Sequence, residues 1–196
     1  MLRVLLVCTG NICRSPMAFG FLADRSERIL EGALRVRSSG TWARPELPPT
    51  DEAAEVAAAR GIDISEHRST PFAADLAEWA DVVLTMTGEQ RDEVLHVAPS
   101  AEAKTFSLKE FVALLGGLPP AEGHTREAMV SRIAEADRLR RSGEPPRPAD
   151  EDVADPIGMS EDTYRSVGWE LEELIDALVR GLAGVSAPVT AAEGEG

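Results

Sequence analysis

The stretch from Val7 to Pro16 constrains the fold most, because it joins a short apolar run to a segment with helical periodicity through a tight loop. The apolar run spans residues 2–7, and the periodic segment begins at Met17. This order predicts a strand, a loop and then a helix. Pro16 suits the first helical position, and Ser15 suits the cap before it. The sequence therefore predicts a helix whose amino end faces the loop.

The loop itself has the residues of an anion site. Cys8 and Arg14 enclose five residues, and a loop of this size can turn its backbone N–H groups inward around an anion. The positive end of the following helix and the Arg14 guanidinium favour phosphate at the same point. We expect Cys8 to be a thiolate near neutral pH in this positive field, with the Ser15 hydroxyl as a donor to it. A thiolate aimed at a bound phosphate is a nucleophile for phosphoryl transfer.

The rest of the chain alternates apolar strand-like runs with helical segments. We expect strands at residues 2–7, 34–38, 82–86 and 103–106, and helices at roughly 16–31, 51–60, 73–80, 88–97, 108–115 and from 160 onward. This alternation predicts an α/β fold: a three-layer sandwich with a central four-stranded parallel sheet and helices on both faces. Ligands of such folds bind at the carboxyl ends of the strands, where Cys8 falls.

We interpret residues 1–184 as a single domain with a surface insertion at about 116–152, followed by an acidic tail, residues 185–196, that we expect to be disordered. Segments rich in glycine and proline flank a charged helical stretch at roughly 124–142. Its thin apolar stripe is typical of a helix on the surface. The insertion either covers the rim of the site or extends into solvent.

Composition excludes several classes of function. The net charge of −14 argues against binding to nucleic acid, which requires a basic face. No apolar run approaches the roughly 20 residues of a membrane helix, and we see no signal peptide. Two cysteines, one needed as a thiolate, indicate a reducing compartment, so we expect a cytoplasmic protein. We also expect the protein to be a monomer. The spacing of histidine, cysteine and acidic residues does not resemble a metal site, and no cofactor is implied.

The segment Cys8-Thr9-Gly10-Asn11-Ile12-Cys13-Arg14-Ser15-Pro16 closely resembles the signature loop of low-molecular-weight protein tyrosine phosphatases. Other segments resemble family landmarks in family order: Ser38 to Thr41, Arg60 to Ser65 leading into His67-Arg68, Asp81 to Thr87, and Asp155-Pro156. The resemblance covers roughly residues 1–115 and 153–183. It implies a cysteine-dependent phosphatase that hydrolyses protein phosphotyrosine, or a small phosphoester, through a phosphocysteine intermediate and without a metal.

The resemblance also implies roles for individual residues. Cys8 is then the nucleophile, Arg14 binds the phosphate, and Asp155 is the general acid. The sequence alone offers other acids nearby, at 150, 151 and 152, although Pro156 restricts Asp155 to an extended geometry that would present its carboxylate rigidly. The resemblance further implies that the substrate phosphate is bound by Thr9, Gly10, Asn11, Ile12, Cys13 and Ser15.

Two further expectations concern the support of this loop. Asn11 is suited to a positive φ, which a tight anion loop requires, and in the family its counterpart is held by hydrogen bonds to residues matching Ser15, Ser38 and His67. Cys13 lies five residues after Cys8, and we hypothesise that peroxide converts Cys8 to a disulfide with Cys13 instead of to irreversible acids.

The substrate cleft departs from the family pattern. Tyrosine-specific members line it with aromatic residues, whereas this chain offers Trp42 after the second strand and Ile157 after Asp155-Pro156. The cleft is therefore poorer in aromatic walls than is usual for phosphotyrosine.

Three alternative functions remain open at this point. Bacterial protein-arginine phosphatases share the Asp-Pro followed by an apolar residue and glycine, but they typically carry threonine where this chain has Ile12. Since isoleucine offers no hydrogen bond to orient a phosphoguanidine, phosphotyrosine is favoured. Arsenate reductases with the same loop need further cysteines, and this chain has only two. The third alternative is a phosphoprotein-binding module without turnover, which hydrolysis of p-nitrophenyl phosphate would distinguish.

Overall fold

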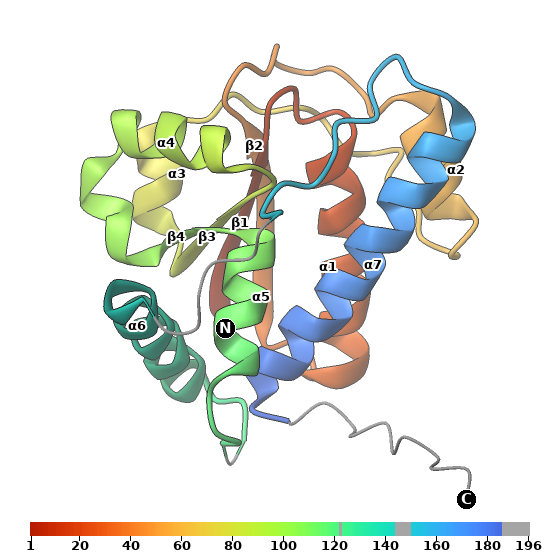
Figure 1. The fold of residues 1–196 in the computed structure, drawn as a ribbon. Coiled ribbons are helices and arrows are strands. Elements are labelled where there is room, and N and C mark those ends of the chain that lie inside the picture. Colours follow the sequence, from red (N-terminus) through yellow and green to blue (C-terminus); the bar gives the residue numbers. More distant parts are fainter. Residues whose placement is uncertain (122, 144–149, 186–196) are drawn as a thin grey trace, which may run out of the picture.

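A computed structural model describes residues 1–121, 123–143 and 150–185. Four strands form one parallel sheet in the order β2-β1-β3-β4, with β1 at Leu2–Cys8, β2 at Leu34–Gly40, β3 at Val82–Thr85 and β4 at Thr105–Ser107. The helices are α1 Arg14–Ile29, α2 Asp51–Ala58, α3 Ala74–Trp79, α4 Gly88–Val97, α5 Leu108–Gly116, α6 Arg126–Ser142 and α7 Glu161–Ala183, with a 3-10 helix η1 at Pro99–Lys104. They cover both faces of the sheet (Figure 1), which confirms the predicted fold class.

The sheet separates two apolar cores of unequal size. Leu2, Val4 and Leu6 of β1 face the larger core, which includes buried side chains of α1, α2, α5, α6 and α7. Leu5 and Val7 face the smaller core, which is formed with α3, α4 and the segment around η1. Because β1 is covered on both faces, nearly every one of its side chains is buried. This explains why its sequence is a continuous apolar run without alternation.

The start of α1 differs from the prediction in a way that matters for the loop. The helix begins at Arg14, and Cys13 stands at its N-cap without a side-chain hydrogen bond. The prediction that Ser15 caps a helix beginning at Pro16 is therefore wrong. The Ser15 hydroxyl bonds instead to Cys8 Sγ at 3.0 Å and to Asn11 Nδ2 at 2.8 Å, so its hydrogen-bonding capacity is used inside the loop.

Helix α6 lies at the end of the sheet opposite the Cys8 loop (Figure 1). Arg126 at its start forms an ion pair with Asp81, which directly precedes β3, and Arg140 donates to the carbonyl of Thr105 at the start of β4. Met129 and Ile133 are buried in the larger core. Helix α6 is thus attached at the amino ends of the strands and does not cover Cys8. Residues 144–149 and the predicted tail beyond residue 185 lie outside the described residues.

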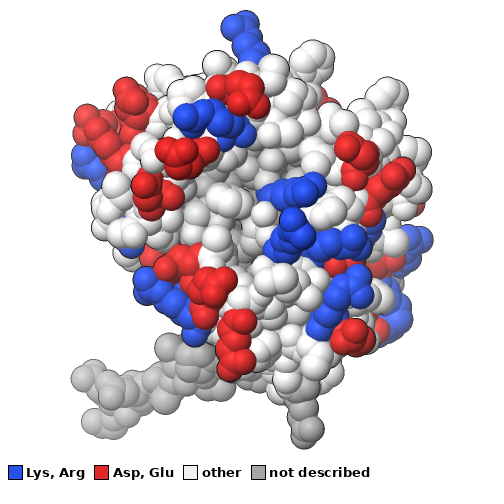
Figure 2. Space-filling model, turned by 180° about the vertical axis from the view of Figure 1, so that it is seen from behind, with Lys and Arg blue, Asp and Glu red and all other residues white. Residues whose placement is uncertain are grey.

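Charged side chains are distributed unevenly over the surface. On the face shown in Figure 2, several basic side chains lie together beside an area without charged side chains, and acidic and basic side chains adjoin elsewhere around it. Part of this face is therefore uncharged, although the net charge of the chain is −14. Within the part of the chain that the structure describes, no helix is both long enough and apolar enough to cross a bilayer.

Candidate active site

Residues 9–13 form a tight loop between the carboxyl end of β1 and the start of α1. Asn11 adopts a φ of 54°, as the sequence predicts for a loop that must curl around an anion. The end of β2 holds this loop closely, because Thr41 N–H donates to Cys8 O and Trp42 N–H donates to Thr9 O, both at 3.0 Å. A Cβ atom at Gly40 would lie 2.4 Å from Thr9 O, so glycine is required there.

The Cys8 sulfur is surrounded by hydrogen-bond donors. Cys8 is 2% exposed, and its Sγ accepts from the backbone N–H of Asn11 at 3.2 Å and lies 3.0 Å from Ser15 Oγ. The Ser15 oxygen already accepts from Asn11 Nδ2, so its own proton is free to point at the sulfur. Hydrogen bonds to the charged form of a group favour that form. The loop therefore provides a specific polar environment for a sulfur anion.

The side chain of Asn11 joins three segments around the loop. Its Nδ2 donates to Ser15 Oγ and to Ser38 Oγ at 3.0 Å, and its Oδ1 accepts from Thr70 N–H at 2.8 Å. Its backbone carbonyl is 2.9 Å from His67 Nε2, which must be the donor because a carbonyl oxygen only accepts. The structure thus brings together all the predicted partners and adds Thr70, which the sequence analysis missed.

His67 supports the loop as a neutral side chain. Burial lowers the pKa of His67, the bond to the Asn11 carbonyl opposes this change, and the nearby Arg68 lowers the pKa further. A neutral imidazole with its proton on Nε2 is the form that donates to Asn11. The contact is with the backbone of the loop, so the arrangement fits a structural role.

Arg14 is buried and aimed at the loop. Its side chain is 3% exposed, its Nη1 donates to Val153 O at 3.0 Å, and its Nη2 donates to Asp155 Oδ2 at 2.6 Å. Its Nε is buried and has no hydrogen-bond partner among the residues that the structure describes. A buried donor without a partner is costly, and a phosphate oxygen in the loop would satisfy it.

The segment that carries Asp155 is fixed at the carboxyl end of β3. Val153 N–H donates to Met86 O at 2.8 Å, and the Asp152 carboxylate accepts from Gly88 N–H, also at 2.8 Å. Asp155 itself is 42% exposed, and its second oxygen accepts from Ile157 N–H at 3.2 Å. These contacts hold the Asp155 carboxylate over the loop while leaving it accessible.

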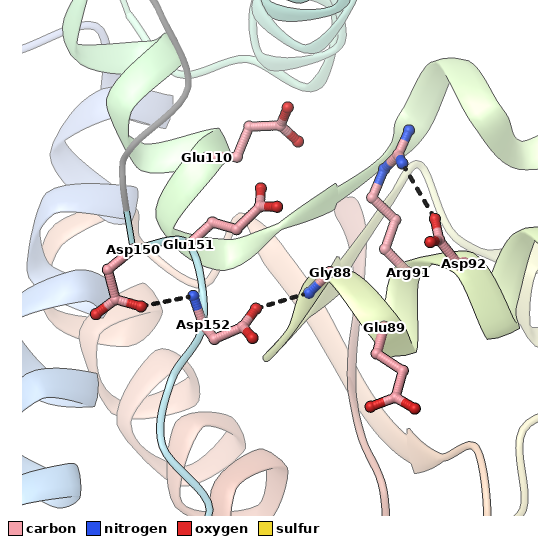
Figure 3. Close-up of a pocket in the computed structure, with 8 residues that line it drawn as sticks. All are labelled: Gly88, Glu89, Arg91, Asp92, Glu110, Asp150, Glu151 and Asp152. Atoms are coloured by element: carbon pink, nitrogen blue, oxygen red, sulfur yellow. Dashed lines mark hydrogen bonds and ion pairs between the residues drawn. The ribbon is translucent and has the colours of Figure 1, made fainter.

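The geometry distinguishes Asp155 from the neighbouring acids. Asp150 forms an ion pair with Lys109, and the Asp152 carboxylate accepts from Gly88 N–H at the start of α4. Figure 3 shows Asp150, Asp152 and Glu151 around a separate hollow of about 380 Å³, which Gly88 and Arg91 also line. Among these four acidic side chains, only Asp155 contacts Arg14.

The expected cleft walls are both open to solvent. Trp42 is 75% exposed and Ile157 is 52% exposed. The Trp42 backbone lies against Thr9, and its indole N–H donates to Glu93 of α4 at 2.7 Å. Ile12 is half-buried and packs against the larger core. The structure therefore places one aromatic ring and one aliphatic side chain on the segments that flank the loop.

Cys13 differs from Cys8 in its surroundings. Both cysteines are free thiols, and the Cys13 sulfur lies 3.5 Å from Tyr164 Oη and 3.6 Å from Thr50 Oγ1. Burial raises the pKa of the Cys13 thiol. Burial and the contact with Cys13 raise the pKa of Tyr164 to about 12. Cys13 is thus a neutral thiol at neutral pH, which disfavours it as the nucleophile.

Gln90 is a further residue that the sequence analysis missed. It is 2% exposed, and its Nε2 donates to Thr9 Oγ1 at 3.0 Å. The signal that could have found it is the Thr-x-x-Gln spacing of Thr87 and Gln90, a capping box that forms at the start of α4.

For metal ions, the described part of the chain contains no group of three or more histidine, cysteine or acidic residues placed to bind one.

An anion bound by the amides of this loop would bring its central atom against the Cys8 sulfur and its oxygens against Arg14. That arrangement, at the carboxyl end of a doubly covered parallel sheet, defines the class of cysteine-dependent phosphatases. Comparison with known proteins identifies the family. The family model of the low molecular weight phosphotyrosine protein phosphatases matches residues 3–117, and the chain belongs to this family.

Relatives within the family carry two kinds of name. A protein-arginine-phosphatase of Geobacillus stearothermophilus is 34% identical over 92% of this chain and 95% of its own length. The protein of the same name from Bacillus subtilis (strain 168) is 32% identical over 91% of this chain and 95% of its own length. A probable low molecular weight protein-tyrosine-phosphatase, EpsP of Ralstonia solanacearum, is 42% identical, but over 55% of this chain and 70% of its own length.

Solved structures share the whole architecture. A YwlE arginine phosphatase variant with a phosphorylated active-site serine has a TM-score of 0.71 at 31% identity, covering 92% of this chain and 95% of that chain. A low molecular weight protein tyrosine phosphatase from T. tengcongensis has a TM-score of 0.70 at 32% identity, covering 92% and 99%. The predicted family is therefore confirmed, and the chain is a phosphatase of phosphorylated proteins.

Proposed function

We propose that this phosphatase hydrolyses protein phosphotyrosine through a phosphocysteine intermediate. In the first step the Cys8 thiolate attacks phosphorus, the S–P bond forms and the P–O bond to the tyrosine oxygen breaks. Asp155 gives its proton to that oxygen, so the leaving group departs as a neutral phenol. In the second step Asp155 takes a proton from water, which attacks phosphorus and releases inorganic phosphate and the thiolate.

The observation that carries this mechanism is the group of Cys8, Arg14 and Asp155 at one end of the sheet. The buried Arg14 Nε, unpartnered among the described residues, supports a phosphoryl group in the loop. The Ser15 hydroxyl, 3.0 Å from Cys8 Sγ, can donate to the sulfur and so supports a thiolate that both attacks and leaves. The 2.6 Å contact between Arg14 and Asp155 supports a carboxylate within reach of the group that Arg14 holds.

Ile12 favours an aryl phosphate as substrate. Its side chain is apolar, half-buried and packed against the core, so it offers contact to a ring but no hydrogen bond to a guanidinium. Trp42 on the neighbouring segment adds an exposed aromatic ring. Phosphotyrosine fits these surfaces better than phosphoserine, whose shorter side chain would not bring its ester to the buried sulfur.

A second candidate is protein phosphoarginine. The protein-arginine-phosphatases match more than nine tenths of this chain, whereas EpsP matches 55% of it. The sequence Asp155-Pro156-Ile157-Gly158, which resembles theirs, also supports this candidate. The two candidates share the chemistry of Cys8 and differ in the group that leaves.

The experiment is a comparison of turnover on peptides of one sequence that carry phosphotyrosine, phosphoarginine or phosphoserine. We expect kcat/KM for phosphotyrosine to exceed that for phosphoarginine by at least about tenfold, a difference of about 1.4 kcal/mol. The matched variant is Ile12→Thr, whose hydroxyl can orient a phosphoguanidine and should shift the ratio towards phosphoarginine. Preference of the wild type for phosphoarginine would assign the second candidate instead. Binding of phosphopeptide without any turnover would indicate a binding module.

We also propose that the protein acts as a monomer in a reducing compartment, the cytoplasm. Two free thiols, Cys8 at the start of the loop and Cys13 within it, support the reducing compartment. Light scattering after size-exclusion chromatography tests the oligomeric state: a mass of about two chains would contradict the monomer.

A further inference from the structure

Gln90 on α4 is fixed by contacts with the backbone at the end of β3. Its Oε1 accepts from Met86 N–H at 3.0 Å and from Thr87 N–H at 3.2 Å. Two donors at one end of the side-chain amide identify that end as the oxygen, so the NH₂ group must face the other way. It faces the loop, where Nε2 donates to the hydroxyl of Thr9 at 3.0 Å.

The Thr9 hydroxyl therefore has a defined polarity. Its oxygen accepts from Gln90 Nε2 and, at 3.5 Å, from Arg14 Nη2. An amide NH₂ and a guanidinium only donate, so neither can take the Thr9 proton. Among residues 1–121, 123–143 and 150–185, no acceptor for this proton is found. The hydroxyl thus keeps one donor for a ligand.

The position of that donor is the mouth of the loop. Thr9 directly follows Cys8, and Arg14 Nη2 contacts both Thr9 Oγ1, at 3.5 Å, and Asp155 Oδ2, at 2.6 Å. A phosphoryl group that bonds to Arg14 would therefore have its oxygens next to the Thr9 hydroxyl. An oxygen that gains negative charge during transfer strengthens a hydrogen bond of this kind.

We propose that Gln90 is a positioning residue, which orients the Thr9 hydroxyl as a hydrogen-bond donor to the bound phosphoryl group. The inference rests on the proposed phosphate loop but not on the identity of the leaving group. It assigns to α4, which does not belong to the loop, a share of phosphate binding. The hydrogen bonds of Gln90 connect the backbone of Met86 and Thr87 with the Thr9 hydroxyl.

The test combines substitutions at both positions. Thr9→Val keeps the shape of the side chain without its hydroxyl, and Thr9→Ser keeps the hydroxyl. Gln90→Met removes the donor, and Gln90→Glu keeps the acceptor for Met86 and Thr87 but presents an acceptor to Thr9, which would turn the Thr9 proton away. Asp92→Asn, on the exposed side of α4, is the control.

The readouts are the dissociation constant of inorganic phosphate, by calorimetry, and kcat/KM on p-nitrophenyl phosphate. Thr9→Val and both Gln90 variants should each weaken phosphate binding and kcat/KM by about tenfold, as expected for one hydrogen bond to a charged group. Thr9→Ser should restore most of the loss, and Asp92→Asn should match the wild type. In the Thr9→Val background, Gln90→Met should cost no more than about twofold, because its partner is already absent.

Two outcomes would overturn the proposal. One is an equal loss from Gln90→Met with and without the Thr9 hydroxyl, which would indicate a merely structural role for Gln90. The other is unchanged phosphate affinity in Thr9→Val. Thermal unfolding identifies a variant that fails to fold, and Gln90→Glu, which preserves the backbone contacts, then decides the question. Phosphate binding is measured without turnover, so a different true substrate would leave this result intact.

Discussion

Arg14 Nη2 lies 2.6 Å from Asp155 Oδ2, although the two residues are 141 positions apart. Arg14 belongs to the first helix, and Asp155 belongs to the segment that precedes the last helix. The pair joins a side chain that is 3% exposed to one that is 42% exposed. Under the proposed mechanism, we expect a phosphoryl group that takes the donors of Arg14 to release the Asp155 carboxyl towards the ester oxygen. The proposal therefore links phosphate binding and delivery of the general acid through one guanidinium.

The role of Asp155 as an acid predicts a dependence on the leaving group. In Asp155→Ala, kcat on an unactivated aryl phosphate such as phosphotyrosine should fall by about 10² to 10⁴, the usual contribution of general acid catalysis. On p-nitrophenyl phosphate the fall should be smaller, because p-nitrophenolate departs without a proton more readily. The measurement is kcat across a series of aryl phosphates, with Asp150→Asn as the matched control. An equal loss on all of them would argue against the acid role.

His67 predicts a loss of stability in mild acid. Because burial lowers its pKa in the folded protein, His67 binds its proton more readily when the chain is unfolded. The contribution of neutral His67 to the free energy of unfolding is therefore complete above pH 6.5, the ordinary pKa of histidine. It is lost as the pH falls from there towards the lower pKa of the folded protein. Urea unfolding should be measured at about pH 8, 7, 6 and 5. The free energy of unfolding should decline more steeply over this range for the wild type than for His67→Gln. Parallel curves would contradict the account.

Asp81 predicts a second, more acidic transition. Burial raises the pKa of Asp81, but hydrogen bonds from Arg3 and Arg126 outweigh this effect and lower the pKa from 3.8 to about 2. The stabilisation is present above 3.8 and is lost as the pH falls towards 2. Asp81→Asn should lower the free energy of unfolding at pH 7 by about 1–2 kcal/mol, allowing for solvent around the two arginines.

The control for Asp81 is Arg126→Gln, which breaks only the link between α6 and the start of β3. It should cost less than Asp81→Asn, because the contacts between Arg3 and Asp81 remain. Chemical denaturation of the three proteins measures the difference. A larger loss from Arg126→Gln would show that the attachment of α6 dominates.

The two cysteines predict reversible inactivation by peroxide. If Cys8 forms a disulfide with Cys13, oxidised wild type should regain most of its activity with dithiothreitol, whereas Cys13→Ser should be inactivated irreversibly. Burial raises the pKa of the Cys13 thiol, so peroxide should attack Cys8 first. Equal recovery in Cys13→Ser, or no recovery in the wild type, would reject the hypothesis.

The sequence predicted the fold well because most of its signals are local. The unbroken apolar run of β1 indicated a strand covered on both faces, and the predicted helix at 88–97 has the bounds of α4. The start of α1 was placed too late, because Ser15 is a good cap in isolation, whereas the structure uses its hydroxyl for Cys8 and Asn11. The 3-10 helix η1 was missed, and β4 is correspondingly shorter than predicted.

The prediction of the site depended on the family resemblance for residues that are far apart in the sequence. Local reasoning found the loop from Cys8 to Arg14, but nothing local connects Asn11 with His67, 56 residues away, or Arg14 with Asp155. Gln90 shows what neither approach provides. Its capping box is visible in the sequence, but its contact with Thr9 depends on how α4 packs beside the loop.

The central claim is that Cys8 carries the phosphoryl group during turnover. The most direct measurement is mass spectrometry of Asp155→Ala quenched in acid during hydrolysis of p-nitrophenyl phosphate, since loss of the base slows the second step. The account predicts one added phosphoryl group on the peptide that contains Cys8, and none in the double variant Cys8→Ala/Asp155→Ala. Turnover with the phosphoryl group on another residue, or continued hydrolysis by Cys8→Ala, would contradict it.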